Sequence, residues 1–428
     1  MKNAKATKWN YIILGSGIAG MAAAEAIRER DPKASILMVS GEKELCFNRP
    51  MLIREFALDG SGAALFEKQQ NWPKQFGVET KLGVMVENID PEERRVAFAG
   101  GETAEYEKLI YTLGARVTVP PIPGAEKDNV FTVRTREDMK EIRGAMKDAK
   151  TAVIIGGGML GLEDAWALKE EKKDVTILEQ KQRVAFGQID QSAGNLMKKR
   201  IERTGTDLFT GVRVLEIGDK EVRFRDMETG EESCAPADMV ILSTGVTPNS
   251  EVGSAAGLET VGGETGWIAV DSSMRTNMPD IFAAGDVAAV NGRNDAIWDE
   301  ARSMGRVAGI NASGGSAEYE HVVPEHVFNG FDTEIFTMAD SSGASTDGVY
   351  IRHADVEIFD YQRERYIRVS LQDGKIAGLL LINAPELAPE LMDAYKAGAG
   401  ENEAREIIQR WKDSHDVNFK PATPFRKR

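Results

Sequence analysis

The sequence is poor in the residues that carry thiol and metal chemistry. Its 428 residues include two cysteines, Cys46 and Cys234, and four histidines. The cysteines are far apart and form no Cys-x-x-Cys or Cys-x₄-Cys pattern. This excludes a dithiol centre local in sequence, a cysteine-ligated iron–sulfur cluster and a structural zinc. The histidines have no cysteine set to join, so we expect no metal site.

Long apolar runs and excess positive charge are also missing. No stretch approaches the roughly 18 apolar residues that a membrane-spanning helix needs. The net charge of −15 argues against non-specific nucleic-acid binding. The apolar run near the N-terminus is short and leads into a glycine-rich turn, so we interpret it as a core strand and not as a signal peptide. We therefore expect a cytoplasmic protein that binds neither membrane nor nucleic acid.

Glycine is abundant, and two of its clusters have the same form. The hexapeptides GSGIAG at residues 15–20 and GGGMLG at residues 156–161 each follow an apolar strand and precede an alanine-rich helix. A second apolar strand follows each helix, so each copy predicts a complete βαβ unit. The candidate binding residues are Gly15, Gly17, Ile18, Ala19 and Gly20 in the first turn, and Gly156, Gly158, Met159, Leu160 and Gly161 in the second.

These turns predict two dinucleotide sites. The first glycine allows the strand to turn tightly into the helix, the second lets a pyrophosphate approach the backbone, and the third allows close packing of helix and strand. The start of the helix then offers unpaired N–H groups and partial positive charge to the phosphates. One such hexapeptide would be weak evidence, but two in the same strand and helix context are strong.

A dinucleotide site of this kind also needs an acidic side chain for the ribose hydroxyls. Glu179 stands 23 residues after Gly156, close to the expected separation of about 20. The first copy is less clear, since Glu42 is the nearest carboxylate and follows Ser40 and Gly41. Later in the chain, Gly285 and Asp286 end a predicted strand. Ligands in open α/β sheets bind at that edge, so Asp286 is placed to hold a further part of the first nucleotide.

The order of the elements indicates that the second βαβ unit is inserted into the first domain. The prolines at positions 120, 121 and 123 cannot join a central strand and read as a linker. From about residue 321 alternating strands and hairpin turns replace the βαβ pattern. We expect four segments: 1–118 and 246–319 as two parts of one domain, 119–245 as the inserted domain, and 320–428 as a C-terminal domain.

Five motifs in this order resemble the two-dinucleotide-binding flavoproteins of the pyridine nucleotide–disulfide oxidoreductase superfamily, over roughly residues 9–315. They are the first turn, KLIYTLGAR before PPIPG, the second turn, STGVTPN, and IFAAGD. The resemblance implies a glutathione-reductase-like α/β fold with two Rossmann-like domains and a C-terminal α+β domain. It also implies FAD at the first turn, with Gly114, Gly285 and Asp286, and NADH at the second, with Gly245.

The segment CFNRPMLIR at residues 46–54 resembles the Tyr-x-Arg-Pro-x-Leu-Ser-Lys segment of the rubredoxin, ferredoxin and nitrite reductase branch. Arg49 is in register, and Arg54 replaces the lysine. The resemblance implies that Arg54 lies beside the flavin and pairs with Glu163, and that the helix from Trp298 approaches the flavin ring. Cys46 is out of register with the redox cysteine of related branches, so the flavin itself would deliver the electrons.

The sequence therefore predicts an NADH-dependent FAD flavoprotein reductase that passes electrons to a small redox protein of rubredoxin or ferredoxin type, or to a partner subunit. Glu179 favours NADH over NADPH because its carboxylate repels a 2′-phosphate, although Lys181 and Arg183 lie nearby. Two alternatives stay open: an oxidase or peroxidase that works through Cys46, and an NADH-responsive flavoprotein subunit without turnover. A homo-oligomer is also open, and the acceptor is not identified.

Overall fold

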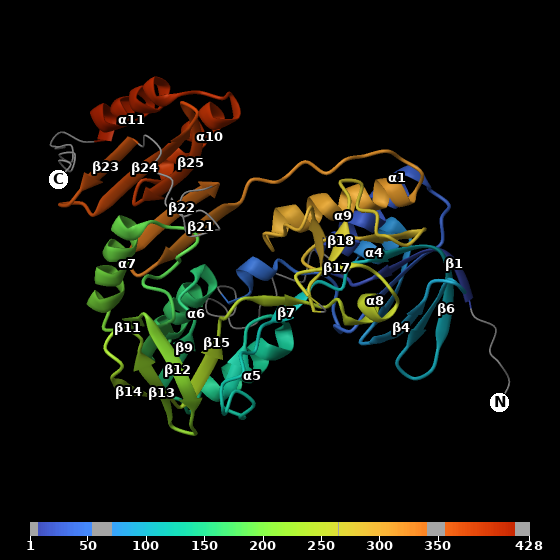
Figure 1. The fold of residues 1–428 in the computed structure, drawn as a ribbon, viewed down its shortest axis with the longest axis horizontal. Helices are drawn as coiled ribbons and strands as arrows, with labels where there is room; N and C mark the ends of the chain where they lie inside the picture. The colour runs from blue at the N-terminus through green and yellow to red at the C-terminus, as the bar shows by residue number, and fades with distance from the viewer. Residues whose placement is uncertain (1–6, 54–70, 264, 340–355, 416–428) are drawn as a thin grey trace. The chain divides into compact units, whose positions relative to one another are not determined.

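The computed structural model describes residues 7–53, 71–263, 265–339 and 356–415, and its contacts divide the chain into two compact units (Figure 1). The first unit comprises Met1–Thr118, Arg134–Met139 and Gly245–Val322. The second comprises Val119–Val133, Lys140–Thr244 and Val323–Arg428. Each nucleotide-binding turn predicted from the sequence falls in a different unit.

The first unit is built on a seven-stranded sheet in the order β3-β2-β1-β6-β5-β4, with β19 pairing with β6. Strands β3, β2, β1, β6 and β19 are parallel, whereas β5 pairs antiparallel with both β6 and β4. The strand bounds are β1 Thr7–Leu14, β2 Ile36–Ser40, β3 Val78–Leu82, β4 Val86–Asp90, β5 Arg95–Phe98, β6 Thr103–Tyr111 and β19 Ile281–Ala283. The strand that returns from the distal part of the chain thus lies beside β6, as the βαβ pattern with an insertion requires.

Helices α1 (Ile18–Arg30) and α9 (Trp298–Ala312) pack against this sheet and against each other. They pack closely because both present small residues. A Cβ added to Gly305 would lie 2.1 Å from the Ala19 carbonyl oxygen, and one added to Gly309 would lie 2.3 Å from that of Ala23. Only glycine therefore fits on α9 at these two points, where the helix packs directly on the α1 backbone.

Shorter elements complete the first unit. They are η1 Arg49–Met51, α4 Trp72–Phe76, β7 Ala115–Val117, β16 Val246–Pro248, α8 Glu251–Ala255, β17 Thr260–Val261, β18 Trp267–Val270 and β20 Ala288–Val290. Strands β7 and β16 pair antiparallel where the chain leaves and re-enters this unit. Helix α5 (Arg136–Met146) begins in the first unit and continues into the second.

The second unit contains a parallel sheet in the order β11-β10-β9-β15-β8. Its elements are β8 Val130–Thr132, β9 Thr151–Ile155, α6 Met159–Glu170, β10 Asp174–Glu179, α7 Gln191–Arg203, β11 Asp207–Thr210 and β15 Met239–Leu242. Strand β9, the glycine turn, α6 and β10 form the expected βαβ unit. An antiparallel meander of β12 (Val212–Ile217), β13 (Glu221–Asp226) and β14 (Glu232–Pro236), which the sequence did not predict, packs beside it.

The C-terminal part of the second unit is an antiparallel sheet in the order β21-β22-β25-β24-β23. Its bounds are β21 Glu325–Gly330, β22 Thr333–Ala339, β23 Val356–Asp360, β24 Arg365–Gln372, β25 Lys375–Ile382, η3 Pro385–Leu387, α10 Ala388–Lys396 and α11 Glu401–His415. Helices α10 and α11 cover one face of the sheet, and their side chains share its apolar core (Figure 1).

The opposite face of this sheet is joined to the nucleotide-binding part of the same unit. Asp190 caps helix α7, and its carboxylate also accepts hydrogen bonds from the Tyr366 hydroxyl at 2.5 Å and from Arg368 at 2.9 Å. The Trp166 ring of α6 meets Phe331 edge-on. The C-terminal sheet is therefore fixed to α6 and α7 by a buried polar cluster and an aromatic contact.

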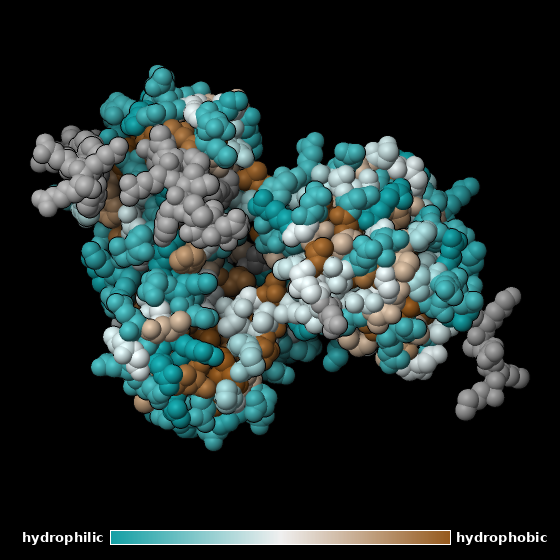
Figure 2. Space-filling model, viewed as in Figure 1, coloured by the Kyte–Doolittle hydropathy of each residue, from teal (hydrophilic) through white to brown (hydrophobic). Residues whose placement is uncertain are grey.

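The architecture confirms the α/β fold class with two Rossmann-like units and a C-terminal α+β part. The visible surface in Figure 2 is mostly hydrophilic, in keeping with the charged residues that make up 28% of the sequence. None of the helices among the described residues is long and apolar enough to span a membrane.

Candidate functional site

The two glycine turns have nearly the same backbone geometry. Gly15 has φ of 111° and Gly156 has φ of 110°, a conformation that side chains rarely adopt. A Cβ on Gly15 would lie 2.0 Å from the Thr112 carbonyl oxygen, and one on Gly156 would lie 2.2 Å from that of Ser243. Both positions are therefore restricted to glycine by conformation and by space.

Each turn leaves a cradle beside its middle glycine. No heavy atom of the described residues lies within 4 Å of a Cβ built on Gly17 or Gly158. These glycines are the N-caps of α1 and α6, and neither helix receives a side-chain capping bond there in the described part of the chain. Unpaired N–H groups at the start of a helix beside open space fit a pyrophosphate.

The remaining predicted residues of the turns begin the two helices, and their surroundings differ. Ile18, Ala19 and Gly20 start α1, and Ala19 is buried. Met159, Leu160 and Gly161 start α6, and 61% of Leu160 is exposed. The first turn is thus enclosed by its own unit, whereas the second opens to solvent at Leu160.

Glu179 lies over the second turn, at the end of β10. One carboxylate oxygen accepts the Gly157 N–H at 2.5 Å, and the other accepts the Lys181 N–H at 2.6 Å. Each carboxylate oxygen retains a further lone pair. The side chain predicted to hold a ribose is therefore held by the turn itself.

Glu42 in the first unit is paired with another predicted residue. Arg49 donates to the Glu42 carboxylate at 2.9 Å and to the Arg134 carbonyl oxygen at 2.5 Å. The Arg49 guanidinium also lies 4.7 Å from the centre of the Phe47 ring. The structure thus brings Glu42 and Arg49 together beside Arg134, an arginine that the sequence analysis did not single out.

Arg134 connects the other predicted residues of the first unit. Its guanidinium pairs with Asp286 at 2.8 Å and lies 3.8 Å from a Cβ built on Gly114. Gly285, which precedes Asp286, has φ of 80° and packs against Ala19 of the first turn. One basic side chain therefore joins the ends of β6 and β19, where a ligand of the first turn would extend.

The sequence contains a helix-start signal directly after Arg134. Thr135 and Asp138 form a capping box at the start of α5. The Asp138 carboxylate accepts the N–H groups of Arg134 and Thr135 at 2.8 and 2.9 Å, and the Thr135 hydroxyl accepts the Asp138 N–H at 3.2 Å. The Thr-x-x-Asp pattern predicts the helix start, but only the fold shows that the preceding arginine turns back to Asp286.

The other predicted residues are Trp298, Gly245, Glu163 and Arg54. Trp298 begins α9 and is partly buried against the core of the first unit. Gly245 has φ of 88°, and its carbonyl oxygen accepts the Thr118 N–H at 2.9 Å. Glu163 lies half-buried on α6, but Arg54 is outside the described residues, so the Arg54–Glu163 pair stays a prediction.

The two thiols differ in exposure. Cys46 is 3% exposed, and burial raises its pKa to about 12, so it is protonated at neutral pH. Cys234 lies exposed on β14 in the second unit. Neither cysteine forms a disulfide within the described residues. Cys46 is therefore not the thiolate that nucleophilic redox chemistry requires.

One group of possible metal ligands occurs among the described residues, formed by Asp295, Glu300 and His321. The side chains already bind one another and their neighbours: His321 Nε2 lies 2.9 Å from Asp295, and Glu300 accepts from the Tyr319 hydroxyl at 3.2 Å. Burial raises the pKa of Glu300. These contacts join Tyr319 and His321, near the end of the first unit, to α9 and the loop before it, and they need no ion.

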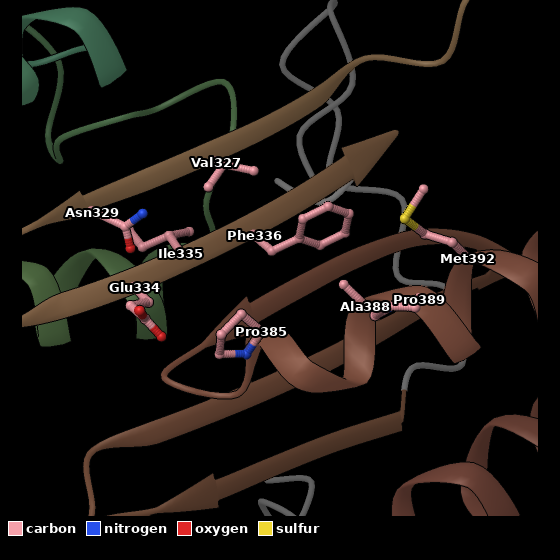
Figure 3. A pocket seen from close by; sticks show the side chains of 9 residues that line it. All are labelled: Val327, Asn329, Glu334, Ile335, Phe336, Pro385, Ala388, Pro389 and Met392. Carbon is pink, nitrogen blue, oxygen red and sulfur yellow. The ribbon is translucent and has the colours of Figure 1, made fainter. Parts of the chain in front are cut away.

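A separate apolar pocket of about 350 Å³ lies on the C-terminal sheet (Figure 3). Strands β21 and β22 and the start of α10 line it with Val327, Asn329, Glu334, Ile335, Phe336, Pro385, Ala388, Pro389 and Met392. None of these residues belongs to either glycine turn, so the pocket is distinct from the two cradles.

Comparison with known proteins agrees with the geometry of the turns. Residues 9–312 match the pyridine nucleotide-disulphide oxidoreductase family. The chain is 29% identical to the NADH-rubredoxin oxidoreductase of Clostridium acetobutylicum, over 91% of this chain and 94% of that protein. It is 27% identical to the epsilon subunit of NADH-dependent phenylglyoxylate dehydrogenase from Aromatoleum evansii, over 87% and 88%. A NAD-dependent persulfide reductase from A. fulgidus has a similar structure, with a TM-score of 0.79, 28% identity and coverage of 96% and 80%.

Proposed function

The chain belongs to the pyridine nucleotide-disulphide oxidoreductase family, and we propose that it is an NADH-dependent FAD flavoprotein that reduces a small redox protein or a partner subunit. The observation that carries this proposal is the presence of two equivalent glycine cradles, one in each unit, together with a buried, protonated Cys46. Two dinucleotides without a reactive thiol leave the flavin as the group that delivers electrons.

The first unit would hold FAD. Gly15, Gly17 and Gly20 form the cradle for its pyrophosphate, and Arg134 and Asp286 lie at the neighbouring strand ends. When bound, FAD accepts a hydride from NADH and can release the electrons one at a time. The protein's part is alignment of the two dinucleotides and electrostatic support.

The second unit would hold NADH, and its charges support NADH over NADPH. The Glu179 carboxylate would repel a 2′-phosphate. Arg183, one of the two nearby basic residues that could offset it, is 4% exposed and donates to the carbonyl oxygens of Ile189 and Phe186 at 2.9 and 3.1 Å. Its guanidinium stacks 4.1 Å from the Phe186 ring centre. Lys181 alone remains exposed, so we expect a clear preference for NADH.

The ratio of kcat/KM for NADH and NADPH tests this preference. We expect at least about a ten-fold advantage for NADH, and Glu179→Gln should reduce it because the repulsion is removed. Arg183→Gln is a structural control, since its guanidinium is turned away from solvent. A native enzyme that used NADPH better would contradict the ribose role of Glu179.

We also propose that Arg54 supports the reduced flavin and pairs with Glu163, following the branch resemblance. Arg54→Ala should slow flavin reduction in anaerobic stopped-flow measurements by roughly a hundred- to a thousand-fold, the range for loss of one electrostatic stabiliser. Arg54→Lys restores the residue type of the related branch and serves as the matched variant. An unchanged rate in Arg54→Ala would remove this arginine from the site.

The class of acceptor is proposed from the relatives of the chain, which include a rubredoxin reductase and a subunit of an NADH-dependent dehydrogenase. Purification with bound partners, followed by an acceptor screen under anaerobic NADH, would identify it. We expect rapid bleaching of a yellow protein by NADH and recovery of the colour by a one-electron acceptor protein. The proposal would be overturned if the purified protein were colourless and if, after reconstitution with FAD, NADH did not bleach its yellow colour.

Thiol labelling separates this proposal from an oxidase or peroxidase that works through Cys46. Labelling of Cys46 should be slow before and after NADH addition, because the side chain is buried. A cysteine that becomes reactive only after reduction would favour the thiol mechanism.

A further inference from the structure

The second unit contains a buried acidic side chain that the proposed function does not use. Asp164 lies on α6, six residues after Gly158, and is 2% exposed. Its neighbours on the helix, Leu162, Ala165 and Leu168, belong to the apolar core. A carboxyl group at such a position is unusual, because Asp is rarely buried unless it is paired with a charge.

The partner of this carboxyl group is a neutral hydroxyl. The Ser243 Oγ donates to the Asp164 carboxylate at 2.5 Å. A hydroxyl compensates an ionised carboxylate less than a guanidinium or ammonium group does. The protonated form of the buried carboxyl group is therefore favoured, and burial raises its pKa from 3.8 to about 7.

Ser243 connects Asp164 to the second glycine turn. The Ser243 N–H donates to the Ile155 carbonyl oxygen at 2.8 Å, just before the turn. Its own carbonyl oxygen lies 2.2 Å from where a Cβ on Gly156 would be, and its Cβ lies 3.2 Å from one on Gly161. Ser243 is thus packed against the first and last glycines of the cradle, and Asp164 lies directly behind it.

We propose that nucleotide binding at the second turn is coupled to protonation of Asp164, so that the site takes up a proton when it binds the dinucleotide. This inference rests on the proposed function of the second turn. A pyrophosphate at the start of α6 brings two negative charges to within about 9 Å of Asp164, from the helical rise of six residues. In a dry interior that repulsion is strong, so the bound dinucleotide favours the neutral form of the carboxyl group.

The surrounding charges do not offer another explanation. Strands β9, β10 and β21 pack against α6, and Ser243 follows β15. The titratable or charged residues on α6 and these strands are Glu163, Lys169, Glu170, Asp174, Glu179, Glu325 and His326. None of them is among the causes of the Asp164 shift, which are burial and the Ser243 hydrogen bond.

Binding of ADP-ribose to the FAD-loaded protein tests the coupling, because this ligand carries the pyrophosphate and adenosine but cannot reduce the flavin. We expect its Kd to rise about ten-fold from pH 6 to pH 8.5. Calorimetry near pH 7 in buffers of different ionisation enthalpy should show proton uptake. In Asp164→Asn the uptake should vanish and the Kd should become independent of pH over this range.

Two matched variants separate Asp164 from its neighbours. Asp174→Asn makes the same change on β10, where the side chain is exposed, and should behave as the native protein. His326→Gln removes the histidine of β21 and should also keep the native pH profile. Equal profiles in the native protein and Asp164→Asn, or loss of the profile in His326→Gln, would overturn the proposal.

Ser243→Ala provides a second test if Asp164→Asn fails to fold. Loss of the hydroxyl removes the hydrogen bond that lowers the Asp164 pKa, so the midpoint of the Kd profile should move to higher pH. An infrared difference spectrum should show the carbonyl band of a protonated carboxyl group growing as ADP-ribose binds. An unmoved midpoint and no carbonyl band would overturn the coupling, whereas ADP-ribose that fails to bind at any pH would overturn the proposed nucleotide site instead.

Discussion

The two glycine turns share their backbone geometry but not their surroundings. Around the first, α1 is buried from Ala19 to Ala24 and again at Ala26 and Ile27, and the glycines of α9 pack against the α1 backbone. Around the second, α6 begins with the exposed Leu160 and buries Asp164 in its second turn. The same turn is therefore enclosed by packed helices in the first unit and exposed to solvent at Leu160 in the second.

If the first turn holds FAD and the second holds NADH, as proposed, this difference means that the turn selects the chemical group and the surrounding elements decide how long the ligand stays bound. An enclosed cradle joined by Arg134 to distant strand ends suits a cofactor that remains bound. An open cradle with a protonatable group behind it suits a substrate that must enter and leave. The four predictions that follow test this contrast.

The largest effects are expected from substitutions that test whether the two turns are separate sites. Gly15→Ala and Gly156→Ala each force a Cβ into a backbone carbonyl at a positive φ, and each should destabilise its unit by about 4 kcal/mol. Gly15→Ala should yield protein without flavin, whereas Gly156→Ala should keep the flavin and lose NADH binding. Flavin absorbance and denaturant unfolding check this, and loss of flavin in both variants would contradict it.

The enclosed frame of the first unit predicts a large cost for a small change on α9. Gly305→Ala places a Cβ 2.1 Å from the Ala19 carbonyl oxygen, so the free energy of unfolding should fall by about 2 to 3 kcal/mol. Gly144→Ala, on exposed α5 with open space around it, should instead stabilise by about 0.5 to 1 kcal/mol. Equal effects of the two changes in urea unfolding would show that α9 does not constrain α1.

Arg134 sharpens the distinction between retained and exchanged ligands. Arg134→Ala leaves Asp286 without its counter-charge, so FAD should bind about ten- to a hundred-fold more weakly, as for loss of a charge-assisted bond. Arg136→Ala, whose partner is Glu44, is the matched control and should change FAD affinity only a few-fold. Fluorescence of released flavin measures both, while a parallel loss of NADH affinity in Arg134→Ala would argue against separate sites.

The smallest expected effect concerns the pH dependence of stability. The Asp164 pKa rises from 3.8 to about 7 in the folded state, so its contribution to stability is fully present below about pH 4 and is lost progressively as the pH rises to about 7. Relative to Asp164→Asn, the native protein should lose about 1 to 1.5 kcal/mol between pH 6 and pH 8. Thermal or urea unfolding at both pH values checks the sign. A constant difference would mean that Asp164 does not change its protonation in this range.

Much of the fold followed from the sequence because its signals are local. The two hexapeptides predicted two βαβ units, and the structure has β1, α1 and β2 around the first and β9, α6 and β10 around the second. The β12–β14 meander was not predicted, because its strands carry many exposed charged residues and lack a long apolar run.

The site divides in the same way. Residues within the turns could be predicted because each glycine serves its own short segment of backbone. Arg134 and Asp164 could not, since each depends on a partner far along the chain, Asp286 for the first and Ser243 for the second. Pairing across such distances is decided by the three-dimensional fold and leaves no periodic trace in one sequence.

The packing of α9 on α1 has a consequence for the protein during its synthesis. Helix α1 leaves the ribosome before residues 298–312, which pack against it, and the nucleotide-binding part of the second unit is made between them. Domains generally fold as units during translation, with the N-terminal ones first. Helix α1 must therefore wait for α9, so the FAD proposed for this unit would be bound stably only after residues 298–312 have been made.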